Sequence, residues 1–252
     1  MALIEDRLYK KIKHAVGRAI ADFGLIEAGD RIAVAVSGGK DSYTLLHMLE
    51  ALRQRAPIKY ELFAINIDSG YPGYRSEIIA DYLNEQGFDH HMEKTAHYQV
   101  IQEKRRPGSS YCSICARLKR GVLYTLAQQF NCNKLALGHH LDDFIETLLL
   151  NQFFVGSLKA MAPRMLADNG VTTVIRPLVY VEERDIIPFF RANNFPVVCC
   201  CCPACGIADQ KRKRMKRLLL ELEREIPFVK RSLLKSLANV HPRHLLDAEL
   251  TK

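Results

Sequence analysis

The stretch Ser37-Gly38-Gly39-Lys40-Asp41-Ser42 decides the fold of this chain, because it lies between a strand and a helix. Residues 31–36 before it form an apolar run rich in β-branched side chains, which predicts a buried strand. Apolar residues follow at helical spacing: Tyr43, Leu45, Leu46, Met48, Leu49 and Leu52. A glycine turn that opens a helix presents backbone N–H groups and the positive end of the helix dipole to an anion. The stretch therefore predicts a phosphate-binding loop.

The common P-loop pattern G-x-x-x-x-G-K-[ST] does not fit, because Val34 takes the first glycine position and Asp41 follows the lysine. What remains, S-G-G-K-D-S, resembles the PP-loop of the N-type ATP pyrophosphatases. That family cleaves ATP between the α and β phosphates and adenylates a substrate oxygen. The resemblance implies that residues 37–42 bind ATP: Ser37, Gly38, Gly39, Lys40, Asp41 and Ser42. It also implies catalytic roles for Lys40 and Asp41. An ordinary glycine-rich turn is the structural alternative.

The composition is that of a globular protein with a basic surface. The 252 residues suffice for one large domain, or for one domain with an appendage. Lysine and arginine number 36 against 28 acidic residues, and the net charge of +8 favours a polyanionic partner. We expect neither a signal peptide nor a membrane span, and hence a cytoplasmic protein. In that reducing compartment, eight cysteines point to metal or redox chemistry more than to disulfides.

Strands and helices alternate along the chain, which predicts an α/β fold with a doubly wound parallel sheet and ligands at the carboxyl ends of the strands. The expected strands are 31–36, 60–67, 89–93, 134–138, 173–177 and 195–198. The expected helices are 4–23, 41–54, 75–86, 116–130, 142–153 and 183–193. We expect the apolar stripe of helix 4–23 to pack across the sheet or against the second subunit of a homodimer. A change in composition near residue 206 divides a domain of residues 1–206 from a basic helical extension of residues 207–252.

The cysteines form two C-x-x-C pairs, Cys112 with Cys115 and Cys202 with Cys205. The first pair is expected in a loop over 104–112 that runs up to helix 116–130. Two such pairs suit a structural zinc site with four sulfurs. Three of the sulfurs suit an iron–sulfur cluster with one open iron.

Together with the glycine loop, these pairs and the segment Gly138-His139-His140 followed by Asp142-Asp143 resemble the tRNA-cytidine 2-sulfurtransferases, a thiolating branch of the PP-loop enzymes. The resemblance implies that ATP adenylates the C2 oxygen of cytidine 32 in the tRNA anticodon loop before sulfur replaces it. It also implies a [4Fe–4S] cluster on Cys112, Cys115 and Cys205, with sulfur supplied by a cysteine desulfurase. Here the chain departs from the family pattern, because Cys199–Cys202 run consecutively, so Cys202 is the second candidate for the third ligand.

Further polar residues are candidates for the nucleotide site. Asp142 and Asp143 follow a predicted strand and open a helix, where carboxylates hold Mg²⁺ in catalysis or simply cap the helix. Gly138 and His139 belong to the segment shared by PP-loop tRNA enzymes, and the resemblance implies that they contact the nucleotide. Asp68 ends a predicted strand and is expected to receive the nucleoside, although a turn with Gly70 competes for its carboxylate.

The segment 211–217 carries six cations in seven residues, which favours contact with RNA phosphates over a merely solvated face. Three alternatives remain open at this stage. A uridine thiolase shares the same motifs, and a lysidine synthetase shares the glycine loop without needing cysteine pairs. A zinc-stabilised RNA-binding module would bind RNA without catalysis.

Overall fold

The computed structural model describes residues 6–104, 111–199, 201–202, 210–247 and 249. The chain divides into two compact units, the first made of Met1–His140 with Ala162–Ala208 and the second of Leu141–Met161 with Asp209–Lys252. The second unit thus joins a helix from the middle of the chain to the C-terminal helices. The domain boundary at residue 206 stays a prediction.

The first unit is built on a mostly parallel sheet with the strand order β3-β2-β1-β4-β6-β5. In the described part of the chain its strands are β1 (Arg31–Ala35), β2 (Glu61–Asp68), β3 (His90–Lys94), β4 (Lys134–Ala136), β5 (Arg164–Leu166) and β6 (Thr173–Ile175). Every neighbouring pair is parallel except β5 with β6. The predicted α/β fold is confirmed, with an antiparallel edge strand that was not predicted.

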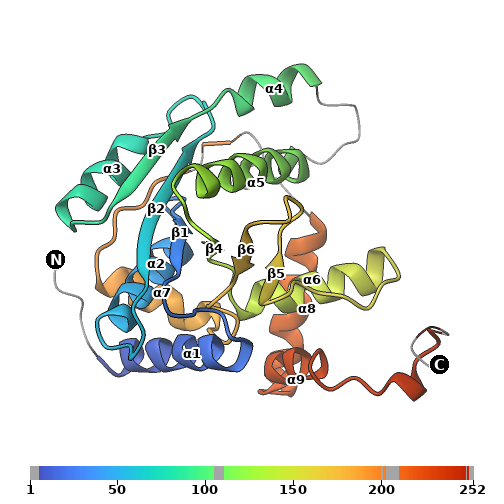
Figure 1. Cartoon of the computed structure of the whole chain (residues 1–252). Coiled ribbons are helices and arrows are strands. Elements are labelled where there is room, and N and C mark those ends of the chain that lie inside the picture. The colour runs from blue at the N-terminus through green and yellow to red at the C-terminus, as the bar shows by residue number, and fades with distance from the viewer. Residues whose placement is uncertain (1–5, 105–110, 200, 203–209, 248, 250–252) are drawn as a thin grey trace. The chain divides into compact units, whose positions relative to one another are not determined.

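Helices cover both faces of this sheet (Figure 1). The first unit contains α1 (Arg7–Phe23), α2 (Lys40–Arg53), α3 (Ser76–Glu85), α4 (His97–Lys104), α5 (Tyr111–Gln129) and α7 (Glu183–Ala192). Helix α5 buries Leu123 and Leu126 against Phe63 and Ile65 of β2. Neighbouring residues of a strand point to opposite faces, so Ala64 of β2 faces the other side, where α2 and α3 pack with α1 and α7 outside them. The sheet is doubly wound as predicted.

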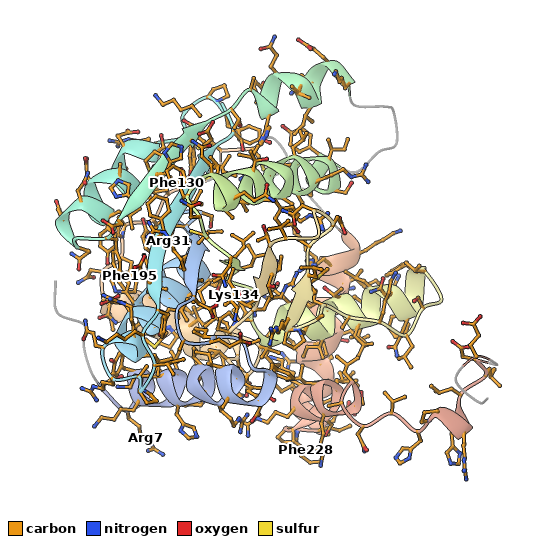
Figure 2. The ribbon with its side chains drawn as sticks, viewed as in Figure 1. Arg7, Arg31, Phe130, Lys134, Phe195 and Phe228 are labelled. Carbon is orange, nitrogen blue, oxygen red and sulfur yellow. The ribbon has the colours of Figure 1, made fainter. Side chains whose placement is uncertain are left out.

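Two buried contacts hold segments that are distant in the sequence against each other near the sheet. Lys134 at the start of β4, labelled in Figure 2, pairs with Asp30 at 2.7 Å, and both side chains are buried. The ring of Phe195 stacks on His47 of α2 at 4.9 Å between ring centroids. This contact holds the following segment against the glycine loop, where the Val198 N–H donates to the Gly38 carbonyl at 3.2 Å. Residues 195–198 are therefore an extended segment outside the sheet, and the strand predicted there is wrong.

The second unit is helical. It contains α6 (Leu141–Phe154), α8 (Gln210–Glu225), α9 (Val229–Ser236) and the 3₁₀ turn Pro242–His244. An apolar core joins α6 to α8 through Leu141, Ile145, Leu149, Met215 and Leu219. This packing agrees with the helical character predicted for the C-terminal segment.

The start of α5 differs from the prediction. The helix was expected at residue 116, but it begins at Tyr111, so both cysteines of the first pair lie in its first turns and not in the preceding loop. Helix α4 was not predicted at all. No helix in the described ranges has both the length and the apolar character that a membrane span requires.

Candidate active site

The glycine loop joins β1 to α2, and its backbone is shaped by glycine and serine. Gly38 has a φ of +80°, in the left-handed region that favours glycine. Ser42 donates to the Gly39 carbonyl at 2.9 Å and accepts from the Ser37 N–H at 3.2 Å, which closes the loop on itself. Gly39 is the N-cap of α2 and has no side chain to cap it. The loop thus leaves the start of α2 without a side-chain cap from Gly39, and its binding of an anion stays a prediction.

The side chains packed around Gly38 also leave no room for a Cβ atom at this position. A Cβ at this position would lie 2.8 Å from Ile79 Cδ1 and 2.9 Å from Val198 Cβ. The glycine loop therefore packs between α3 and the segment that leads to the second cysteine pair.

The two charged residues of the loop, Lys40 and Asp41, pair with each other. Lys40 Nζ lies 2.9 Å from Asp41 Oδ2 and 3.1 Å from Glu183 Oε1 at the start of α7. Burial alone would lower the pKa of Lys40, but the two carboxylates outweigh it and hold the pKa above its ordinary value. Lys40 therefore stays cationic at the mouth of the loop, where it suits a phosphate.

The predicted Gly138-His139-His140 segment lies directly against this loop. A Cβ on Gly138 would lie 3.1 Å from the carbonyl carbon of Asp41, so glycine lets the two backbones approach closely without a shift. His140 is buried, with Nε2 3.7 Å from Asp41 Oδ1. His139 Nδ1 accepts a hydrogen bond from Arg176 Nε at 3.2 Å. That donor leaves Nε2 as the proton-bearing nitrogen of a neutral His139 ring.

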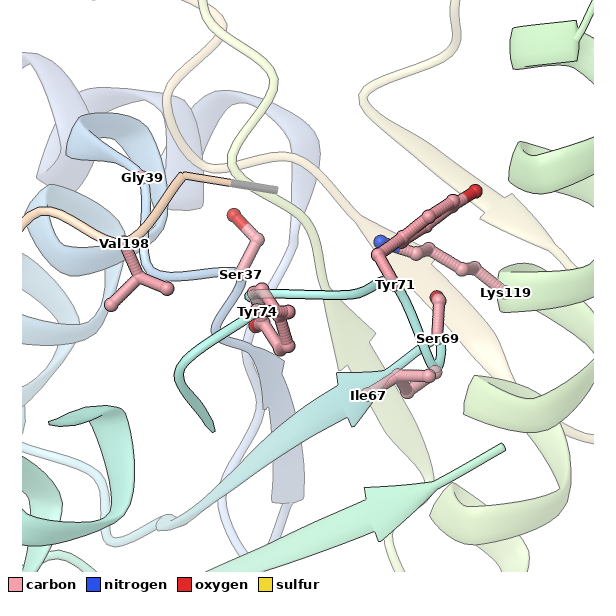
Figure 3. A pocket seen from close by; sticks show the side chains of 8 residues that line it. All are labelled: Ser37, Gly39, Ile67, Ser69, Tyr71, Tyr74, Lys119 and Val198. Carbon is pink, nitrogen blue, oxygen red and sulfur yellow. The ribbon is translucent and has the colours of Figure 1, made fainter. Parts of the chain in front are cut away.

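A pocket opens beside the glycine loop, with about 460 Å³ of empty space that is partly open to solvent. The loop that follows β2 supplies two tyrosines to its wall, and α5 supplies Lys119 (Figure 3). The full lining is Ser37, Gly39, Ile67, Ser69, Tyr71, Tyr74, Lys119 and Val198. The pocket therefore connects the start of α2 with α5, the helix that carries the first cysteine pair.

Cysteines from both pairs lie close to Tyr71, in the loop that follows β2. Tyr71 donates its hydroxyl hydrogen to Cys115 Sγ at 3.5 Å. Cys115 and Cys202 both pack against the cluster of Tyr71, Ile101 and Tyr111. Cys112 lies one turn before Cys115 on α5 and is exposed. The structure thus gathers thiols from two distant segments of the chain next to the pocket.

The predicted cluster ligands lie only partly within the described residues. Within the described ranges, no three His, Cys, Asp or Glu side chains lie close enough together to hold a metal ion. The predicted third ligand, Cys205, lies outside the described residues, as does Cys200. Cys201 has a φ of +50°, unusual for a residue other than glycine, and its thiol donates to the Gly73 carbonyl at 3.3 Å.

The remaining predicted residues have partners of their own. Asp68 accepts from the Gly70 N–H at 2.9 Å, the turn that was considered as an alternative role. In the second unit, Asp142 pairs with Lys230 at 3.0 Å and Asp143 with Arg212 at 3.2 Å. Their assignment to Mg²⁺ stays a prediction.

Sequence reasoning missed Glu183, Arg176 and the tyrosines of the pocket as site residues. Glu183 is separated from Lys40 by 143 positions, and no local pattern links them. The run Gly70-Tyr71-Pro72-Gly73-Tyr74, with two aromatic residues in a turn at the carboxyl end of a strand, was the available signal for the pocket.

Comparison with known proteins identifies the family. The PP-loop domain family matches residues 6–198 of the chain. A tRNA-cytidine(32) 2-sulfurtransferase from Geobacter metallireducens is 77% identical over 252 residues, which cover all of this chain and 98% of the relative. The protein of the same name from Geotalea uraniireducens is 78% identical over 247 residues, covering 98% of each chain.

A solved structure shares the fold at much lower identity. The U34-tRNA thiolase NcsA from Methanococcus maripaludis, solved with its [4Fe–4S] cluster, matches with a TM-score of 0.75 and 21% identity. The match covers 92% of this chain and 78% of NcsA. At this identity the likeness supports the fold alone.

Proposed function

Because the chain belongs to the PP-loop family of tRNA-cytidine(32) 2-sulfurtransferases, we propose that it converts cytidine 32 of tRNA to 2-thiocytidine at the expense of ATP. Because the chain belongs to a family of enzymes, the alternative of a non-catalytic zinc module is not supported. The chemistry needs an activated oxygen and a sulfur nucleophile at the same carbon. The structure must therefore bring a nucleotide loop and sulfur ligands to one pocket.

The observation that carries this proposal is the double role of the loop after β2. Tyr71 lines the pocket beside Ser37 and Gly39, and its hydroxyl also contacts Cys115 Sγ. Lys119, one helical turn after Cys115 on α5, lines the same pocket. A base in this pocket would thus lie between the phosphate loop and the first cysteine pair.

The residues of the glycine loop would bind and orient ATP. The start of α2 and the cationic Lys40 stabilise negative charge on the phosphates. The C2 oxygen of the base attacks the α phosphorus, the bond to the bridging oxygen breaks, and pyrophosphate leaves. A sulfur nucleophile at the oxidation level of sulfide then adds to C2, and AMP leaves with the oxygen, so the base keeps a C=S bond.

The cysteines present fit a [4Fe–4S] cluster by their donor chemistry. Thiolates are the usual ligands of such clusters, and Cys112 and Cys115 at i and i+3 share one face of α5. Cys202 packs on the same aromatic cluster as Cys115, and Cys205 is the third ligand that we propose. When bound, the cluster would present sulfur for transfer at an iron without a protein ligand. Tyr71 would donate a hydrogen bond to the Cys115 sulfur.

Four further assignments rest on the sequence and belong to this proposal. ATP binds as its Mg²⁺ complex with Asp142 and Asp143 as ligands. A cysteine desulfurase supplies the sulfur as a persulfide, and two electrons from a thiol reductant bring it to the oxidation level of sulfide. The protein acts in the cytoplasm, where tRNA is modified, and forms a homodimer.

The test is mass spectrometry of tRNA nucleosides from a strain that lacks the gene, complemented with variants. Wild-type protein should restore 2-thiocytidine, while Cys112→Ala and Cys115→Ala should not. Cys132→Ala is the matched control, because this buried cysteine lies in the core under α5 and not beside the pocket. Unchanged 2-thiocytidine in the deletion strain would overturn the proposal, and loss of 2-thiouridine alone would identify a uridine thiolase.

A further inference from the structure

The end of α6 in the second unit exposes two adjacent aromatic side chains. Phe153 is 58% exposed and Phe154 is 42% exposed. Lys211 of α8 places its Nζ 4.7 Å from the centroid of the Phe154 ring, a cation–π contact at the surface. An exposed apolar patch with a polar rim is typical of an interaction site.

Two adjoining grooves run beside these rings, with about 1220 and 780 Å³ of empty space that includes open solvent. Both grooves are lined by Phe154, Arg214 and Arg217. Phe153 lines the larger groove, and Lys211 and Lys213 line the smaller one. The surface therefore combines aromatic faces with a row of cations from a single helix.

Helix α8 is held so that this row faces the grooves. Its apolar side chains Met215 and Leu219 are buried in the core shared with α6. Arg212 pairs with Asp143 at 3.2 Å and with Glu146 at 3.3 Å, which ties the start of α8 to α6. The cations that line the grooves thus stand on a packed helix.

We propose that Phe153, Phe154, Lys211, Arg214 and Arg217 form a platform that binds an unpaired stretch of the tRNA substrate. The two rings stack on unpaired bases, and the cations contact the flanking phosphates. Aromatic stacking beside a basic groove is how proteins bind single-stranded RNA without reading its sequence. This inference rests on the proposed function for the choice of tRNA as the partner.

Charge favours RNA over a second copy of this chain as the occupant. A symmetric dimer through this surface would place the same lysines and arginines of both copies against each other. Among the described residues that line the grooves, Glu221 is the one acidic residue, and it lies 3.9 Å from Arg217. A polyanion satisfies these cations, whereas an identical basic surface does not.

The experiment uses the full-length protein and a tRNA anticodon stem-loop with 2-aminopurine at one unpaired loop position, without ATP. Stacking on an aromatic ring quenches 2-aminopurine fluorescence, so the readout reports the contact itself. The Phe153→Leu/Phe154→Leu double variant should bind roughly 5- to 100-fold more weakly and lose the protein-induced quenching. Arg214→Gln should keep the quenching and lower the slope of log K against log salt by about 1.

Phe228→Leu is the matched control, because Phe228 is 63% exposed in the same unit but lines neither groove. It should bind like the wild type, and equal melting temperatures would show that all variants fold. Unchanged affinity and quenching in the double variant would overturn the platform. So would a change from dimer to monomer in sedimentation with RNA binding intact, because the surface would then join two copies. Binding and quenching by a wild-type protein that makes no 2-thiocytidine would support the platform while refuting the proposed function.

Discussion

Gly138 offers a test of the nucleotide site at a single backbone position. An alanine methyl group there would lie 3.1 Å from the Asp41 carbonyl carbon and 3.3 Å from the Ser42 backbone nitrogen, so the start of α2 would have to shift by a few tenths of an ångström. We expect Gly138→Ala to displace the start of α2 and to raise the KM for ATP at least tenfold. The measurement is ATP-dependent pyrophosphate release by the purified protein.

The control for this change is Gly121→Ala. A Cβ on Gly121, in the interior of α5, meets nothing within 4 Å. Alanine stabilises a helix interior by about 0.5–1 kcal/mol relative to glycine, so this variant should melt slightly higher and keep its KM. Equal KM values for the two variants would contradict a tight contact between the glycine loop and Gly138.

The single residues that can be predicted from the sequence are those that belong to a local sequence pattern. Gly38 and Gly138 were predicted because a turn and a shared motif contain them. Glu183 pairs with Lys40 only because α7 packs beside α2, and that tertiary contact has no counterpart in a local spacing. Lys119 lines the pocket with Tyr71 and Ser37, and no local spacing links positions so far apart in the chain.

At the scale of elements, most strands were predicted to within a few residues, but the exposed edge strand β5 and the short helix α4 were not. Strand β5 consists of three exposed residues, so it has no alternating pattern to detect. Helix α4 buries only His97 and Ile101, which is too few positions for a helical stripe. The segment 195–198 has the apolar composition of a strand but bonds to the glycine loop instead of a neighbouring strand.

The contact between α6 and α8 should make stability depend on pH. Burial raises the pKa of Glu146 to about 7, with Asp142 and Asp143 adding to the shift and Arg212 and Lys216 opposing it. The folded protein therefore holds a proton on this group between its ordinary pKa of 4.5 and about 7, where the unfolded chain does not. This stabilisation is complete below the lower value and is lost as pH rises through the upper one.

We thus expect the melting temperature to fall from pH 5 to pH 8, and Glu146→Gln to flatten that part of the profile. Glu221→Gln removes an exposed carboxylate of α8 and should leave the profile unchanged. Circular dichroism melts at half-unit pH intervals give the comparison. A Glu146→Gln profile parallel to that of the wild type would show that another group titrates.

At the scale of the whole molecule, the two units are expected to bind different ligands. The α,β-methylene analogue of ATP should occupy the glycine loop of the first unit, and anticodon stem-loop RNA should cover the end of α6 and the start of α8 in the second. Hydrogen exchange with each ligand alone measures the two footprints. The analogue should slow exchange of the amides that begin α2, whereas the exposed edge strand β5 serves as the internal reference.

A ligand that binds only the folded state at 100 times its Kd adds about 2.7 kcal/mol to the free energy of unfolding. Amides of β1 and β4 that exchange through unfolding of the sheet should then slow by up to roughly 100-fold with the analogue. Gly138→Ala should reduce this protection to roughly 10-fold or less at the same analogue concentration, while leaving the RNA footprint on α8 intact. Protection of α8 by the analogue without any effect at α2 would place the nucleotide outside the glycine loop, and the adenylation step would then have no phosphate site in the first unit.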